Sequence, residues 1–261
     1  MTVRKLLMLA LPIAAVVAGC SSAEKDLANG LIARVLDETS EVQESEDAKF
    51  SYTAEGEFLT VKWNKGPLKG TDRTFELVNT SGPIYEYAMS TATEEGYLVA
   101  IANQDALFAL GAVDNIDSDV SALGAAHFGT APTNVPTSGV ANYEGATAGL
   151  LVNLSPNNSD DAFVGRSQVQ VNFGTGVVNG SFDQLVADNA GSLPQIFFTG
   201  AMNSGESTYG ATSIEWGAEA ATGTLMGGLY GPGASSTAGV FDITNNGGSA
   251  RAVGGYLAGQ P

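Results

Sequence analysis

The chain has 261 residues, of which 44% are hydrophobic and only 15% are charged, and its formal net charge is −17. This length accommodates one large domain or two modest ones, and the hydrophobic fraction is enough for a packed core. A surface of this acidity repels phosphate backbones, which argues against nucleic-acid binding. Acidity of this kind serves solubility, although it would also suit a basic partner.

The first residues are typical of a secretory signal. Arg4 and Lys5 precede a hydrophobic run over 6–17, which leads to Val-Ala-Gly-Cys ending at Cys20. This ending resembles a bacterial lipobox, in which the chain is cleaved before the cysteine and the thiol is acylated. We therefore expect residues 1–19 to be a lipoprotein signal peptide and Cys20 to carry a membrane anchor. The alternative is a plain signal peptide with an incidental cysteine. Cys20 is the only cysteine, so an intramolecular disulfide cannot form.

Residues 20–49 are predicted to be an acidic tether. Six acidic residues lie between Asp37 and Asp47, which is typical of a solvated segment. Apolar residues with partial helical spacing over 27–36 predict a short helix there.

Two regions with strand patterns follow the tether. Residues 50–123 contain alternating segments separated by Gly-Pro turn signals, which predicts a small β-rich domain. Residues 124–138 are predicted to be a linker because they combine glycine and proline with small polar residues. Of the 33 glycines, eight lie before residue 124 and 25 from residue 124 on, which marks a change of composition.

Residues 139–261 are predicted to form an eight-stranded antiparallel β-barrel. Eight candidate strands occur at regular intervals, and eight are enough to close a small barrel that side chains can fill. The candidates are 139–154, 164–173, 176–184, 194–202, 207–216, 220–230, 238–244 and 250–258. The predicted fold class is therefore all-β: a barrel preceded by a small β-rich domain, with the lipoprotein signal and the acidic tether at the N-terminus.

Three pieces of this half carry a family resemblance. They are the strand 141–145, the hairpin 169–182 and the segment 228–241, which reads GLYGPGASSTAGVF. They resemble the barrel domain of transferrin-binding protein B and of related small lipoproteins, called transferrin-binding-like solute-binding proteins. The resemblance implies the barrel fold and a binding role at the bacterial surface. The residues interpreted as a barrel-closing motif are Gly228, Tyr230, Gly231, Pro232, Ala234, Gly239 and Phe241. The family usually has polar and acidic residues where this chain has Gly233, Ser235 and Ser236.

Few residues suggest site chemistry. His127 is the only histidine and could ligate haem iron together with a tyrosine such as Tyr143, or could be a packing or surface residue. Acidic clusters over 114–119 and 157–161 could hold Ca²⁺, but solvated turns are the favoured interpretation. No nucleophile elbow, zinc motif, phosphate loop or dinucleotide fingerprint occurs, so we expect no enzyme activity, no metal site and no cofactor.

Aromatic residues in the first β region, namely Trp63, Tyr85, Tyr87 and Tyr97, could form a binding face, or the core of a small sheet. The chain is therefore predicted to be a lipid-anchored envelope protein on the outer membrane, facing either the cell surface or the periplasm. We expect it to capture a host or environmental protein, or an iron- or haem-type ligand. The alternative is a structural or interaction lipoprotein without a solute ligand.

Overall fold

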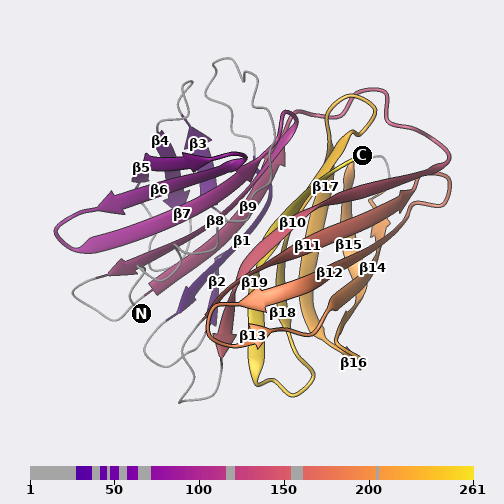
Figure 1. Cartoon of the computed structure of the whole chain (residues 1–261). Coiled ribbons are helices and arrows are strands. Elements are labelled where there is room, and N and C mark those ends of the chain that lie inside the picture. The colour runs from indigo at the N-terminus through magenta and orange to yellow at the C-terminus, as the bar shows by residue number, and fades with distance from the viewer. Residues whose placement is uncertain are drawn as a thin grey trace.

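The computed structural model describes residues 28–36, 42–45, 48–52, 58–63, 72–115, 121–153, 161–203 and 206–261. Within these ranges all regular structure is β-strand, and the strands form two sheets that lie side by side (Figure 1). The all-β fold class is confirmed. The predicted signal peptide and Cys20 lie outside the described residues.

The first sheet has nine strands within the described ranges, all antiparallel, in the order β2-β1-β9-β8-β7-β6-β5-β4-β3. These strands are β1 (Ala28–Leu36), β2 (Val42–Ser45), β3 (Ala48–Tyr52), β4 (Phe58–Trp63), β5 (Asp72–Ser81), β6 (Ile84–Ser90), β7 (Glu94–Ala102), β8 (Ala106–Asn115) and β9 (Ser121–Gly129).

The helix expected over 27–36 is wrong, because β1 occupies this segment. β1 pairs with β9 from Leu31↔Ala126 to Leu36↔Ser121. Apolar spacing over so short a segment fits either period, and the edge of β9 supplies the backbone partners that decide for a strand. β1 and β2 therefore lie within 20–49, the range expected to be a tether. β9 likewise extends past residue 123 into the expected linker.

The second sheet closes into the predicted eight-stranded antiparallel barrel. Its strands are β10 (Val140–Asn153), β11 (Asp161–Asn172), β12 (Val177–Ala187), β14 (Ile196–Met202), β15 (Thr208–Trp216), β17 (Thr222–Tyr230), β18 (Ser236–Thr244) and β19 (Ala250–Gly259). β10 pairs with both β11 and β19, and β11 pairs with β12, so the ring has no free edge. Two short strands, β13 (Gly191–Ser192) and β16 (Glu219–Ala220), pair with β12 and β15 outside the ring.

Aromatic side chains fill the barrel interior. Phe182 lies at its centre, with ring-centroid distances of 5.0 Å to Phe241 and 5.2 Å to Tyr256. All three side chains are fully buried. An eight-stranded barrel has an interior that side chains of this size can occupy completely, so the interior is a packed core.

The first sheet docks on one side of the barrel. Phe108 and Leu123 of β8 and β9 pack with Val240 of β18 and Val253 and Leu257 of β19 in one buried cluster, which we call the docking core. The inner face of the first sheet has a separate core that includes Leu59, Phe75, Leu98 and Val113. In the ring order of the barrel, β12 and β14 lie opposite β18 and β19. The wall made by β11, β12 and β14 therefore faces away from the first sheet.

Candidate functional site

The turn between β17 and β18 contacts the connection between the two sheets. Gly231 has a φ of +75°, in the left-handed region that favours glycine. Its N–H donates to the Thr130 carbonyl at 3.1 Å, and the Gly233 N–H donates to the Thr133 carbonyl at 2.6 Å. Thr133 and Pro232 also form a parallel bridge. The turn thus holds the connecting segment 130–139 against the barrel.

The β7–β8 turn of the first sheet reaches the same place. Asp105 accepts a hydrogen bond from the Ser235 hydroxyl at 2.6 Å, and the Asn103 amide donates to the Ser236 hydroxyl at 3.0 Å. A Cβ on Gly231 would lie 2.4 Å from Cγ of Asp105 and 2.4 Å from the Ser235 hydroxyl oxygen, so a larger residue would displace the two side chains that are hydrogen-bonded to each other here. Ser235 and Ser236 are therefore both hydrogen-bonded to the first sheet. We call residues 103–106, 130–133 and 230–236 the junction.

His127 lies on the barrel-facing side of β9 and is fully buried. Its Nδ1 is hydrogen-bonded to the Tyr230 hydroxyl at 2.7 Å, while its Nε2 has no hydrogen-bond partner among the described residues. Burial lowers the pKa of His127 to about 3, because the charged imidazolium is disfavoured away from water. The ring is therefore neutral at physiological pH, and it joins β9 to the end of β17.

Tyr143 binds the same turn from inside the barrel. Its hydroxyl donates to the Ala234 carbonyl at 2.8 Å, and that carbonyl also accepts the Gln260 amide at 2.9 Å. Burial raises the pKa of Tyr143, so its hydroxyl stays protonated. The structure thus gives His127 and Tyr143 different partners, and both are buried. Haem ligation by these residues stays a prediction, and it would require both side chains to leave packed cores.

The remaining residues of the proposed barrel-closing motif lie around this turn and in the barrel core. A Cβ on Gly228 would lie 2.9 Å from the Tyr230 hydroxyl, and one on Gly239 would lie 2.5 Å from the Tyr256 hydroxyl. Phe241 is fully buried in the barrel interior, whereas Pro232 is exposed at the turn.

Sequence reasoning missed a buried polar network inside the barrel. The Tyr209 hydroxyl is hydrogen-bonded to Thr237 at 2.7 Å and also to the Tyr256 hydroxyl, and Thr237 donates to the Gly228 carbonyl at 2.9 Å. Burial raises the pKa of Tyr209 to about 12, so the network carries no charge at neutral pH. The sequence signal that could have indicated this network is strand alternation, which places Tyr209 and Tyr256 at positions that face the barrel interior. Every polar group named here is satisfied within the barrel.

The tyrosines of the first sheet belong to its packing. Tyr87 lies in the inner core and is buried, Tyr97 is buried, and Tyr85 packs partly buried against the inner core. Burial raises the pKa of Tyr87 to about 12. The core interpretation is therefore confirmed for Tyr85 and Tyr87. The side chain of Trp63 lies outside the described residues.

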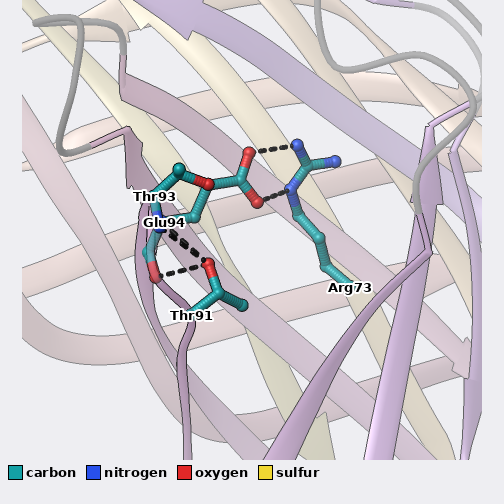
Figure 2. Close-up of polar contacts among 4 residues, drawn as sticks. All are labelled: Arg73, Thr91, Thr93 and Glu94. Carbon is teal, nitrogen blue, oxygen red and sulfur yellow. Dashed lines mark hydrogen bonds and ion pairs between the residues drawn. The ribbon is translucent and has the colours of Figure 1, made fainter.

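A buried ion pair stabilises one end of the first sheet (Figure 2). The Arg73 Nε donates to a Glu94 carboxylate oxygen at 2.9 Å, and a second guanidinium nitrogen donates to the other oxygen. The Thr91 hydroxyl accepts the Glu94 N–H at 2.9 Å, which fixes the start of β7. Only 4% of the Arg73 side chain and 14% of the Glu94 side chain are exposed. Both charges are therefore neutralised within the protein.

The acidic clusters show no metal site within the described ranges, where no group of three or more potential ligands could hold a metal ion. Asp161 is buried and accepts the N–H groups of Asn189 and Ala190, each at 2.8 Å. Asp117, Asp119 and residues 157–160 lie outside the described residues. In the described part of the chain, no helix has the length and hydropathy to span a membrane.

Comparison with known proteins identifies the barrel. The family model of the C-lobe and N-lobe beta barrels of Tf-binding protein B matches residues 135–258. A search of the curated proteins returns no match.

Two solved structures of transferrin-binding protein B are similar to the whole fold. A double mutant from Haemophilus parasuis Hp5 is 16% identical with a TM-score of 0.55, and the match covers 88% of this chain and 44% of that chain. Intact Ap-TbpB, with its N and C lobes, is 14% identical with a TM-score of 0.53, and the match covers 88% of this chain and 46% of that chain. The chain thus spans less than half the length of these structures, and the likeness concerns the fold alone. Residues 135–258 therefore form a β-barrel that matches the barrel-domain model of the transferrin-binding protein B family.

Proposed function

We propose that this chain is a lipid-anchored binding protein of the bacterial envelope that captures a protein or an iron- or haem-type ligand on its outer surface. The observation that carries the proposal is the filled interior of the barrel. Phe163, Phe182, Phe198 and Tyr256 are packed together there, so a ligand would bind to loops and outer walls.

The junction supports this function because it holds the first sheet and the barrel together, so that both can present one binding surface. Asp105 accepts a hydrogen bond from Ser235, Asn103 donates one to Ser236, and His127 is hydrogen-bonded to Tyr230. These contacts link the first sheet to residues 230–236 of the barrel. A platform that does not need to be ordered on binding loses little conformational entropy. The lipobox at Cys20 supplies the anchor in this proposal, and the barrel family supplies the class of binding protein.

Binding of the chain from residue 21 onward, immobilised on a sensor surface, tests the proposal. Candidate ligands are transferrin, haemoglobin and free haem, each titrated to saturation. We expect saturable binding of at least one. Failure with all of them, together with a deletion phenotype limited to envelope integrity, would favour the structural lipoprotein instead.

Two further measurements separate the parts of the proposal. Protease treatment of intact cells should remove the protein if it faces outward, and a Cys20→Ala chain should lose membrane association. We expect His127→Ala to leave any haem titration unchanged, because the ring is fully buried against Tyr230. A lost haem signal in that variant, with the fold intact by circular dichroism, would restore His127 as a ligand.

A further inference from the structure

The barrel wall that faces away from the first sheet carries an uncharged polar surface. Cross-strand register places its side chains in two parallel rows over β11, β12 and β14. We call this surface the polar wall. Its first row is Gln170, Asn179 and Thr199, and its second row is Gln168, Ser181 and Phe197. The first row is exposed, and so is Phe197. Their neighbours along each strand, such as Val178 and Phe198, point into the barrel core.

The charge of the polar wall differs from that of the chain. None of its six side chains is ionised, although the chain carries a net charge of −17. In the second row the flanking positions are Glu144 on β10 and Glu215 on β15. On the next row, Arg166 and Asp183 neutralise each other in a bidentate pair. An anionic ligand would be repelled by the whole molecule and a cationic one would prefer the carboxylates, so this surface is complementary to a neutral ligand.

The hydrogen bonds of the polar wall leave groups for such a ligand. The Gln170 amide donates to the Asn142 amide oxygen at 2.9 Å, and the Thr199 hydroxyl donates to the Asn179 amide oxygen at 3.2 Å. In these contacts Gln170 uses a donor and Asn179 uses its acceptor, which leaves the Gln170 oxygen and the Asn179 N–H groups for other partners. Neighbouring strands lie about 4.8 Å apart, so adjacent amides can reach neighbouring hydroxyls of one ligand.

Phe197 adds an exposed aromatic ring beside these amides. Its exposed fraction is 42%, and the electron-rich face of such a ring attracts weakly positive C–H groups. The core of a protein–protein interface is more apolar than this surface. The exposed side chains of Val177 and Phe197 do not form one apolar patch, because the row that holds Asn179 lies between them. A flat array of amides and hydroxyls with one aromatic ring instead matches the hydroxyls and C–H faces of sugar rings.

We propose that the polar wall binds a neutral polysaccharide or the neutral part of a glycan. This proposal goes beyond the proposed function, and sugar binding at the polar wall does not depend on capture of a protein ligand. The sugar rings would lie across β11, β12 and β14, with hydroxyls paired to Gln170 and Asn179 and a C–H face against Phe197.

Native affinity electrophoresis of the chain from residue 21 onward tests this site. Gels would contain dextran, mannan or laminarin as neutral polysaccharides, or alginate as an anionic one. We expect retardation by at least one neutral polysaccharide and none by alginate. The double variant Asn179→Ala/Phe197→Ala should weaken retardation about tenfold or more, because it removes one hydrogen-bonding group and the ring.

The matched control is Val186→Ala/Thr224→Ala, which removes one exposed apolar and one exposed polar side chain outside the polar wall. It should migrate as the parent does, and both double variants should keep the parental melting temperature. The proposal is overturned if no neutral polysaccharide retards the chain, if only alginate does, or if both double variants are retarded equally.

A protein partner at the polar wall would give a different result. The Asn179→Ala/Phe197→Ala variant would then lose capture of the protein ligand while no polysaccharide retarded the parent, and this outcome also overturns the proposal. Conversely, if the parent captures no protein but is retarded by a neutral polysaccharide through Asn179 and Phe197, the function proposed above fails while the polysaccharide site stands.

Discussion

The first sheet and the barrel ring are both antiparallel, but among the described residues only the first sheet has edge strands that lack a partner on one side. The barrel closes through β10, β11 and β12, so each strand of its ring has a partner on both sides. The first sheet is open and ends at β2 and β3. Closure removes the unpaired backbone groups that an open sheet must protect. The barrel can therefore be complete by itself, whereas the first sheet shares part of its core with the barrel.

The side chains at the docking core show how this sharing works. Ala106 and Ala125 on β8 and β9 are buried there, as is Ala238 on β18. Short side chains let the two sheets approach closely, and Phe108 then fills the space between them. This comparison teaches that the first sheet should depend on the barrel for stability more than the barrel depends on the first sheet. Four predictions test the differences between these two regions, and the first of them tests this dependence.

Removing the Phe108 side chain should weaken the docking core, through which the first sheet gains stability from the barrel. Phe108→Ala is expected to cost about 3–5 kcal/mol of unfolding free energy, the usual range for a buried phenylalanine, and to split thermal unfolding into two transitions. The first sheet would unfold first, because it loses the docking core while the barrel keeps its own. Calorimetry combined with limited proteolysis would show this. The control Phe198→Ala, inside the barrel, should keep one transition at lower temperature; a single transition in Phe108→Ala would contradict the asymmetry.

Removing a guanidinium should affect the two regions unequally. Arg73→Ala in the first sheet leaves the Glu94 carboxylate buried without its partner, and losses of about 3–5 kcal/mol are usual for such a change. Arg166→Ala in the barrel removes a pair of the same bidentate geometry, in which 43% of the Arg166 side chain and 15% of the Asp183 side chain are exposed. Because water already reaches this pair from the Arg166 side, a smaller loss is expected. Urea unfolding would compare them. Equal losses in both variants would show that burial does not decide the value of these pairs.

The burial of His127 between the two sheets should make the stability of the protein sensitive to acid. The pKa of His127 is about 3 in the folded protein and about 6.5 in an unfolded chain. Between these values the unfolded state binds more protons, so stability is complete above about pH 6.5 and falls as the pH decreases toward 3. The loss over the whole window is on the order of 5 kcal/mol.

A His127→Gln variant isolates this effect from that of the carboxylates. The difference in unfolding free energy between parent and variant, measured in urea at a series of pH values, should change only between about pH 3 and 6.5. A difference that stays constant across the window would mean that His127 does not titrate on unfolding as proposed.

The smallest expected effect compares two glycines. A Cβ on Gly239 in the barrel would lie 2.5 Å from the backbone oxygen of Met226, which cannot move without disturbing the strand pair. Gly239→Ala should cost about 1–3 kcal/mol. A Cβ on Gly111 in the first sheet would lie 3.2 Å from the Leu98 side chain, which can adjust, so Gly111→Ala should cost less. Melting temperatures would rank the two. A larger loss at Gly111 would contradict the expectation that a clash with the backbone costs more than a contact with a movable side chain.

Much of the barrel could be predicted from the sequence because strand alternation and turn residues are local signals. The alternation in 169–173 and the glycines near 174 and 231 place strands and turns that the structure contains. β1 could not be predicted in this way, because its identity depends on pairing with β9, which is distant in the chain. The role of Ser235 was equally hidden, since its partner Asp105 lies on the other sheet.

For this protein, the sequence by itself determined the all-β class, the barrel and its family, because alternation, glycine placement and the turn at Gly231 act within single hairpins. The tertiary structure alone decided that this turn joins two sheets, that His127 and Tyr143 are buried on different partners, and that Asn179 and Phe197 share one outer wall. The physical reason is that burial and contact between distant strands depend on register and ring closure, which no local pattern encodes.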